Sequence, residues 1–127
     1  FIEEPEAHLF PEAQKNLVEF ISFVHSNSNC DFFITTHSPY ILTAANNLMY
    51  AHTVGKVSEQ RANEVIPKDI WLPPEDVSGY FLKNGELEDL YSSELKMFKA
   101  ELIDKTSENV EELYGRLSDI EYEEKHE

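Results

Sequence analysis

The sequence has few of the features that mark secreted, membrane-bound or disulfide-stabilised proteins. It holds a single cysteine, Cys30, so no disulfide can form within the chain, which suits a reducing cytosol. No apolar run approaches the roughly 20 residues that a bilayer-spanning helix needs, and no signal peptide is recognisable. We therefore expect a cytoplasmic protein without a membrane partner.

Basic residues are also scarce. Ten lysines and arginines stand against 25 acidic residues, which gives a formal net charge of -15. Proteins that bind a phosphate backbone usually present a basic face, so we do not expect this chain to bind nucleic acid directly. The general effect of such a charge is to keep a protein soluble.

Glycine is rare and never clustered, because Gly55, Gly79, Gly85 and Gly115 stand singly. The chain therefore lacks the G-x-x-x-x-G-K-[ST] loop, whose backbone N–H groups and lysine hold the phosphates of a bound nucleotide. A Leu-Ser-Gly-Gly type signature is absent too. No backbone cradle for β- and γ-phosphates is thus predicted within these 127 residues.

The residues that are present alternate between strand and helix patterns. A strand is predicted to end at Ile2, a helix to begin at Pro11, a strand to cover residues 30–35, a helix to run from Tyr40 towards Asn47, and a strand to cover residues 48–54. This alternation predicts an α/β fold with parallel strands and flanking helices.

The character of the sequence changes after Gly55. Residues 56–74 are polar and contain several prolines, with Trp71 as the one large anchor, and Asn84-Gly85 between apolar stretches predicts a β-hairpin. Acidic helices are expected to follow, the last capped by Thr106 or Ser107. We therefore divide the domain into a core, residues 1–55, and a hairpin with a helical extension, residues 56–127.

The last helix carries one apolar stripe. Its members recur at helical spacing: Val110, Leu113, Tyr114, Leu117 and Ile120. We expect the stripe to pack against the domain, and the alternative is an interface with a partner.

Two adjacent carboxylates, Glu3 and Glu4, follow the first strand. Ligands of open α/β sheets bind at the carboxyl ends of the strands, and adjacent residues of an extended chain point in different directions. One carboxylate can therefore face Mg²⁺ while the other orients a water molecule, and transfer of a phosphoryl group to water needs both. Taken alone, these acids would favour a solvated loop over a catalytic site.

A histidine at the end of the next strand strengthens this interpretation. His37 follows Thr35-Thr36, so it lies at the same sheet edge as Glu3 and Glu4 if the strands are parallel. An imidazole there can hydrogen-bond a γ-phosphate or the attacking water. A lone loop histidine is more often structural, so the hypothesis rests on the joint arrangement.

These residues resemble a known family. Residues 2–14 (IEEPEAHLFPEAQ) resemble the Walker B motif and D-loop of ABC-type P-loop ATPases, and more closely those of bacterial AAA-type ATPases grouped with OLD-family and SMC-like proteins. Residues 35–42 (TTHSPYIL) resemble the switch-histidine loop, and residues 74–85 resemble the C-terminal hairpin of these proteins. Phe1 stands at what reads as the end of a buried strand, so we expect a C-terminal piece of a P-loop ATPase that starts at Walker B.

The resemblance implies a role for each matching residue. Glu3 stands at the Walker B acid that holds Mg²⁺, Glu4 at the catalytic glutamate, and His37 at the switch histidine that contacts the γ-phosphate. The D-loop residues that would meet the nucleotide site across an ATP-bound dimer are Glu6, Ala7 and His8. The implied partner is thus a second copy of the parent ATPase.

Two positions depart from the family pattern. ABC transporters usually carry Asp at the position of Glu3, and relatives often carry His at the position of Phe10. Phe10 has no side-chain acceptor for a helix cap, so the start of the first helix should depend on packing. A metal site made of Glu6, His8 and His37 is a minor alternative hypothesis.

Three functions follow as hypotheses. The first is that the chain forms part of a Mg²⁺-dependent ATPase. This chain by itself should then be inactive, because binding of ATP and Mg²⁺ needs the phosphate-binding half that these residues lack. The second is a non-catalytic interaction module that docks an effector such as a nuclease or toxin through its acidic tail and the aromatic residues Tyr80, Phe81 and Tyr91. The third, a metal-dependent TOPRIM nuclease, is disfavoured because no Glu followed by an Asp-x-Asp cluster is found after Gly55.

Overall fold

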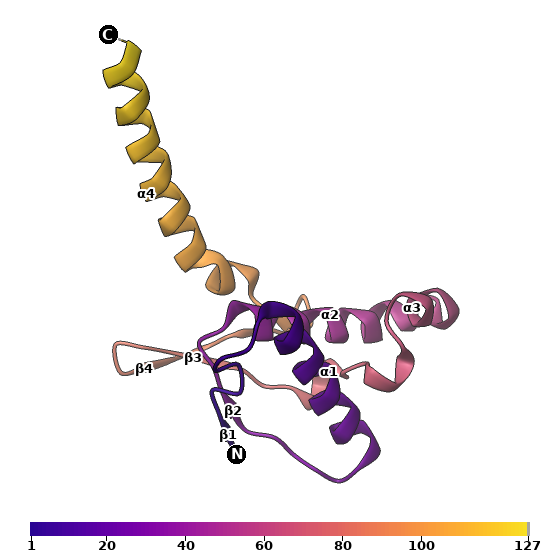
Figure 1. The fold of residues 1–127 in the computed structure, drawn as a ribbon. Coiled ribbons are helices and arrows are strands. Elements are labelled where there is room, and N and C mark those ends of the chain that lie inside the picture. The colour runs from indigo at the N-terminus through magenta and orange to yellow at the C-terminus, as the bar shows by residue number, and fades with distance from the viewer. Residues whose placement is uncertain (127) are drawn as a thin grey trace.

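The computed structural model describes residues 1–126, and it describes the side chains of these residues outside 100–112 (Figure 1). Strands and helices mix along the chain. In order they are β1 (Ile2–Glu3), α1 (Pro11–Asn27), β2 (Ile34–Thr35), α2 (Pro39–Gly55), α3 (Glu59–Val65), the 3-10 turns η1 (Lys68–Ile70) and η2 (Pro74–Asp76), β3 (Tyr80–Lys83), β4 (Glu86–Asp89), β5 (Tyr91–Ser92), β6 (Met97–Phe98) and α4 (Ala100–His126).

The first two strands are parallel, as predicted. Ile2 pairs with Ile34 and Glu3 with Thr35, and α1 forms the crossover between them. Backbone hydrogen bonds from Ile2 to the Phe33 carbonyl and from Glu4 to the Thr35 carbonyl, both 2.8 Å, fix this register. The second strand is shorter than the predicted span 30–35.

Helix α1 begins where the sequence predicts. Pro11 opens it, where the missing N–H of proline costs nothing. Phe10 precedes it without a side-chain cap and is largely exposed, so packing of Phe10 does not fix the start of the helix either. The buried face consists of Gln14, Val18 and Ser22.

The prediction of a strand over residues 48–54 is wrong, because α2 continues through this segment to Gly55. No proline or glycine interrupts residues 48–54, so nothing ends the helix at Asn47. The buried residues of α2 also recur at helical spacing: Ile41, Ala44, Leu48 and Ala51. A third strand therefore does not join β1 and β2 in the part of the chain that the structure describes.

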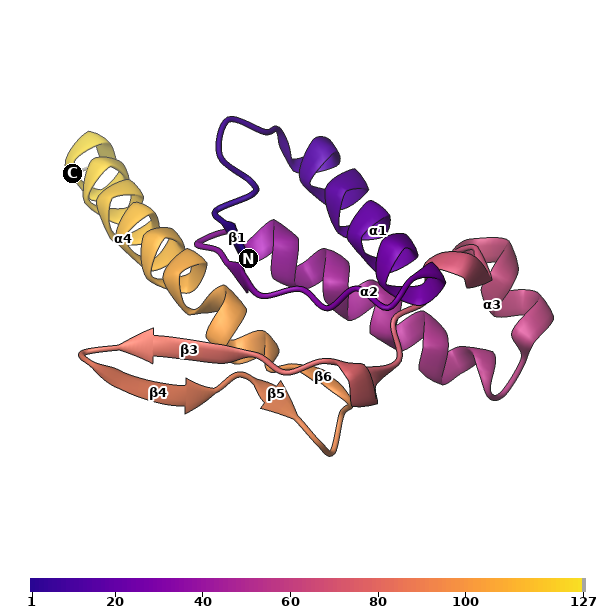
Figure 2. The same cartoon turned by 90° about the horizontal axis from the view of Figure 1, so that it is seen from below.

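Helix α2 lies between α1 and the strands β3–β6 (Figure 2). Its buried residues contribute to three hydrophobic clusters. The clusters are Val18, Ile41, Ala44 and Leu48 against α1; Met49, Leu90 and Phe98 against the strands; and Ala51, Ala62 and Trp71 against α3. The core is thus arranged around a single helix.

Residues 56–74 are more ordered than a loop, because they contain α3 and η1. Ser58 caps α3 by accepting a hydrogen bond from the Arg61 N–H. Trp71 is the predicted anchor: it is buried and its indole N–H donates to the Ile66 carbonyl at 2.7 Å.

The predicted hairpin forms, with β3 and β4 joined by Asn84 and Gly85. Both turn residues have positive φ, 51° and 78°, as a type I′ turn requires. A second pair, β5 and β6, was not predicted, and it buries Phe98 on α2. All residues of β3 and β4 are exposed.

The acidic C-terminal region is one helix, α4, which begins at Ala100 and not at a cap on Thr106 or Ser107. It projects away from the other elements (Figure 1). The prediction that its apolar stripe packs against the domain is wrong for the described members, because Leu113, Leu117 and Ile120 are 58%, 67% and 56% exposed. No helix among the described residues combines the length and apolar character needed to cross a membrane.

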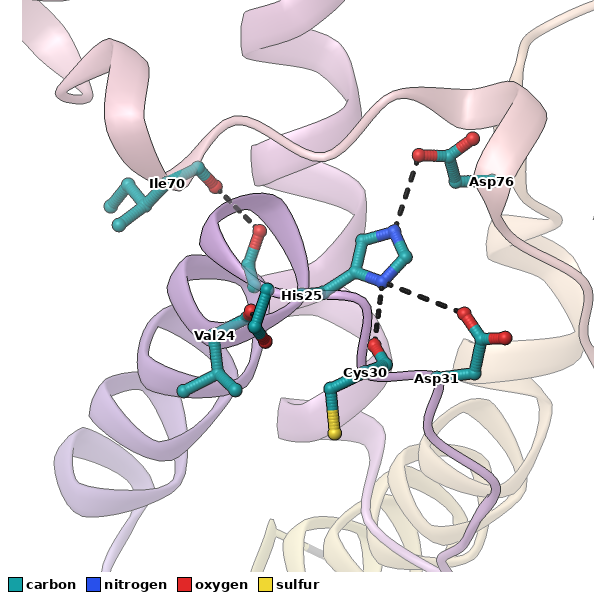
Figure 3. A network of polar contacts seen from close by, with 8 residues as sticks. Val24, His25, Cys30, Asp31, Ile70 and Asp76 are labelled. Carbon is teal, nitrogen blue, oxygen red and sulfur yellow. Dashed lines mark hydrogen bonds and ion pairs between the residues drawn. The ribbon is translucent and has the colours of Figure 1, made fainter.

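A polar cluster around His25 holds the segment that leads to β2 (Figure 3). Nδ1 of His25 lies 3.0 Å from the Cys30 carbonyl oxygen, and Nε2 lies 3.2 Å from Asp76 Oδ2 in η2. Both ring nitrogens donate only when the imidazole is protonated. The Cys30 carbonyl, followed by the Asp76 carboxylate, therefore raises the pKa of His25.

The approach of Trp71 to Gly55 gives a test of the core. A Cβ atom on Gly55 would lie 2.3 Å from Trp71 Cζ3, and the indole is buried and hydrogen-bonded, so it cannot move aside freely. We expect Gly55→Ala to lower the free energy of unfolding by about 1–3 kcal/mol. Urea denaturation measures this. In the control Gly115→Ala, no atom lies within 4 Å of the new Cβ, and a gain of about 0.5–1 kcal/mol is expected from helix propensity. Equal effects would contradict the packing argument.

The raised pKa of His25 predicts a pH dependence of stability. A group whose pKa is raised on folding contributes most below its unfolded pKa, here near 6.5, and loses that contribution as pH rises through the folded value. The advantage of the wild-type chain over His25→Gln in free energy of unfolding should therefore be largest below about pH 6.5 and fall as the pH rises above it, by up to about 1 kcal/mol for so exposed a cluster. His126→Gln at the end of α4 serves as the control. An advantage that is constant with pH would refute the role of His25.

Candidate functional site

The parallel pairing of β1 and β2 brings Glu4 and His37 to one edge of the sheet. Each residue follows the carboxyl end of its strand, and the register places the two chain segments side by side. Nε2 of His37 lies 3.1 Å from Oε1 of Glu4. The predicted catalytic pair is therefore in direct contact.

This contact is open to solvent. The side chain of His37 is 88% exposed and that of Glu4 is 48% exposed. An ion pair in such a position contributes at most about 1 kcal/mol to stability, so it does not fix the loops. The described surface has hollows beside α1 and α3 and beside β5, and neither is lined by Glu4 or His37.

The backbone at Glu4 is unusual. Glu4 has φ of 46°, in the left-handed region that non-glycine residues seldom adopt, and it precedes Pro5. The turn that follows is held by hydrogen bonds from the Ala7 N–H to the Glu4 carbonyl, 3.0 Å, and from the Leu9 N–H to the Glu6 carbonyl, 2.9 Å. His8 also has positive φ, 65°. Such conformations gather at functional sites, where the surrounding structure maintains them.

Glu6 contacts the loop of His37 within the same chain. Its Oε1 accepts a hydrogen bond from the backbone N–H of His37 at 2.9 Å. Partial burial alone would raise the pKa of Glu6, but the hydrogen bonds from the His37 and Glu6 backbones lower it overall. Glu6 therefore joins the turn after β1 to the loop after β2, a contact that sequence reasoning missed when it placed Glu6 only in a dimer interface.

Glu3, Ala7 and His8 lie beside this pair without joining it. All three are exposed, and within the described part of the chain the Glu3 carboxylate has no hydrogen bond or ion pair. The described residues contain no cluster of three or more His, Cys, Asp or Glu side chains that could hold a metal. The alternative metal site of Glu6, His8 and His37 is thus not formed, and Glu3 could hold a cation only together with ligands from elsewhere.

Beneath the exposed pair, Gln14 and Ser38 form a buried contact that the sequence did not reveal. The Ser38 hydroxyl donates to Gln14 Oε1, and Gln14 Nε2 donates to the Leu9 carbonyl at 3.0 Å. The hydroxyl oxygen also caps α2, accepting from the N–H groups of Tyr40 and Ile41 at 3.2 and 3.4 Å. A serine before a proline is a recognisable cap signal, whereas nothing in the sequence marks Gln14 as its partner.

Comparison with known proteins gives one match. Residues 1–42, about a third of the chain, match the AAA ATPase domain family. The matched segment runs from β1 to the first turns of α2, so it contains Glu3, Glu4, Glu6 and His37. Neither the curated proteins nor the solved structures gave a match. The family match supports the interpretation that the chain contains part of an ATPase.

The buried contact of Ser38 predicts a large loss on substitution. Ser38→Ala removes the cap of α2 and leaves the buried Gln14 Oε1 without a partner, so the free energy of unfolding should fall by about 1–3 kcal/mol in urea denaturation. Ser58→Ala is the matched control, since Ser58 caps α3 with a 3.4 Å bond to Arg61 and has no buried side-chain partner. Its loss should stay below about 1 kcal/mol. Equal losses would show that the Gln14 contact adds nothing to capping.

Proposed function

We propose that this chain is the part of an ATP-hydrolysing protein that supplies its acidic residues and its switch histidine. The observation that carries the proposal is the 3.1 Å contact between Glu4 and His37 at the carboxyl ends of two parallel strands. The match of residues 1–42 to the AAA ATPase domain supports it. The closer relation to OLD-family and SMC-like proteins, and a bacterial origin, belong to this proposal.

Glu4 is the proposed general base. Its carboxylate is half exposed, so a water molecule can reach it, and Oε1 lies 3.1 Å from Nε2 of the His37 imidazole. A base must lie within about 2.6–3.2 Å of the proton that it removes, and an open carboxylate at a strand end satisfies this for a water bound at the same edge. His37 then contacts the γ-phosphate while it orients Glu4 through Nε2.

Glu3 is the proposed ligand of Mg²⁺. The ion is usually bound by one or two carboxylates together with water and phosphate oxygens, so one free carboxylate beside a nucleotide suffices. Glu3 meets this requirement because it is exposed and unpaired among the described residues. When bound, Mg²⁺ neutralises charge on the phosphate oxygens.

The remaining parts of the site must come from other chain segments. The sequence has no Gly-rich phosphate loop, and neither the hollow beside α1 and α3 nor the hollow beside β5 is lined by Glu4 or His37. We assign the turn of Glu6, Ala7 and His8, of which Ala7 and His8 are exposed, to the surface that meets a second copy of the parent protein when ATP is bound. Residues 1–55 then belong to the ATPase core and residues 56–127 extend the same domain, in the cytoplasm.

Substitution of Glu4 tests the proposal in the full-length protein that contains this chain. We expect Glu4→Gln to lower kcat for ATP hydrolysis by about 10²–10⁴-fold with little change in ATP binding, because the amide cannot accept the proton of the attacking water. His37→Ala should lower kcat by about 10²-fold or more. Glu12→Gln, an exposed acid of α1, is the control and should leave the rate unchanged. Phosphate release and calorimetric ATP titration measure the two quantities.

The chain alone completes the same test. Without a phosphate loop it should bind ATP with a Kd above about 1 mM and hydrolyse none. Turnover by the chain that disappears in Glu4→Gln would overturn the predicted inactivity of the chain alone. A full-length protein whose ATP hydrolysis is unaffected by Glu4→Gln would refute the role of Glu4.

A second candidate function is docking of an effector protein such as a nuclease or toxin. The observation in its favour is the fully exposed hairpin of β3 and β4, on which Tyr80 and Leu82 are 63% and 69% exposed. Tyr91 does not belong to this surface, because it packs against the cluster of Met49, Leu90 and Phe98. Docking becomes the leading function if the full-length protein hydrolyses no ATP.

A further inference from the structure

Helix α4 carries an apolar stripe with the spacing of a coiled coil. Leu113, Leu117 and Ile120 are separated by four and three residues, and each is more than half exposed. The same alternation of three and four extends back in the sequence to Val110. Val110 and Leu117 thus take a positions of a heptad repeat, and Leu113 and Ile120 take d positions.

The stripe has no covering element in the described structure. Figure 1 shows α4 projecting away from the other elements, and Figure 2 shows that it begins near β6 and that its far end lies apart from α1, α2 and α3. A helix with one apolar face gains most of its stability from packing of that face, and a solvated helix is only marginally stable. The stripe is therefore a surface that needs a partner.

The charges beside the stripe suit a second copy of the same helix. Arg116 precedes Leu117 and takes a g position, while Glu121 follows Ile120 and takes an e position. In a parallel pair in register, a g residue meets the e residue of the next heptad on the other helix. Arg116 of each copy then faces Glu121 of the other, and the twofold symmetry forms this pair twice.

The charged residues beyond Ile120 limit the length of the seam, because Glu123 and Glu124 take g and a positions. Asp119 and Lys125 take c and b positions of the same repeat, away from the seam. Lys125 pairs with Glu121 along the helix, which places a base and an acid of one copy together beside Arg116 of the other. The apolar contact therefore ends at Ile120, and the acidic side chains of Glu123 and Glu124 oppose its extension.

We propose that α4 pairs with α4 of a second copy as a parallel two-stranded coiled coil. The pairing needs no nucleotide, so it is separate from the ATP-dependent contact proposed for Glu6, Ala7 and His8. It would keep two copies together through the whole ATP cycle and raise the effective concentration of one ATPase core near the other.

Sedimentation velocity of the chain without nucleotide, over a range of concentrations, tests the pairing. A reversible dimer is expected, and Leu117→Ala should raise its Kd roughly tenfold or more, because each copy loses a buried leucine and alanine preserves the helix. Tyr122→Ala is the matched control, since Tyr122 is an exposed aromatic residue on the opposite face of α4. It should leave the Kd unchanged.

Charge reversal tests the register. Arg116→Glu alone and Glu121→Arg alone should each weaken the dimer, because each places two like charges opposite one another. The two substitutions together should restore it, because in the parallel arrangement they exchange the signs of one pair and keep it attractive. An antiparallel pair would place Arg116 beside the partner copy's other g positions, so the double substitution would not restore it.

Several results would overturn the proposal. A chain that remains monomeric at every concentration assigns the stripe to a different protein. A dimer that is insensitive to Leu117→Ala places the contact elsewhere, for example at the exposed edges of β1 and β2. Assemblies larger than two, or no restoration by the double charge reversal, would exclude the two-stranded parallel geometry. None of these results depends on whether the parent protein hydrolyses ATP.

Discussion

The contact between Gln14 and Ser38 is the interaction on which the candidate site depends. It is buried, and its two side chains join four segments: the end of the turn after β1 through the Leu9 carbonyl, helix α1, the loop of His37, and the first turn of α2. A buried polar pair of this kind costs little while it is intact and about 1–3 kcal/mol when one partner is removed. The exposed pair of Glu4 and His37 therefore rests on a buried polar contact.

Magnitudes decide what holds Glu4 and His37 together. Their own contact is solvent-exposed and contributes at most about 1 kcal/mol. The backbone bonds of β1 to β2, the bond from the His37 N–H to Glu6, and the Gln14–Ser38 contact act together and are better shielded. The geometry of the pair thus comes from the scaffold, and both side chains remain free to contact a substrate.

The sequence predicted the parallel strands and the proximity of Glu4 to His37, but less of the fold around them. Glu4, His37 and the parallel strands could be found because acids and a histidine at strand ends carry a local signal. The strand predicted over residues 48–54 failed because an apolar run of that length suits a buried helix and a buried strand equally. The placement of Gln14 and Glu6 could not be predicted, since each depends on a partner more than 20 residues away. The helical spacing of the stripe agrees with α4, but the prediction that the stripe packs against the domain failed, because periodicity does not say what covers an apolar face.

The two exposed surfaces of the chain differ in what can cover them. The turn of residues 6–8 is polar and strained, so contact with another protomer there must be specific and small, as suits an interface that opens and closes with a bound nucleotide. The stripe of α4 is apolar and regular, so its burial is driven by area and is insensitive to nucleotide. A weak switchable contact works efficiently only between protomers that stay close together. If both surfaces join copies of this chain, the stripe of α4 keeps the two protomers close together. The ATP cycle then needs to move only the turn beside Glu4.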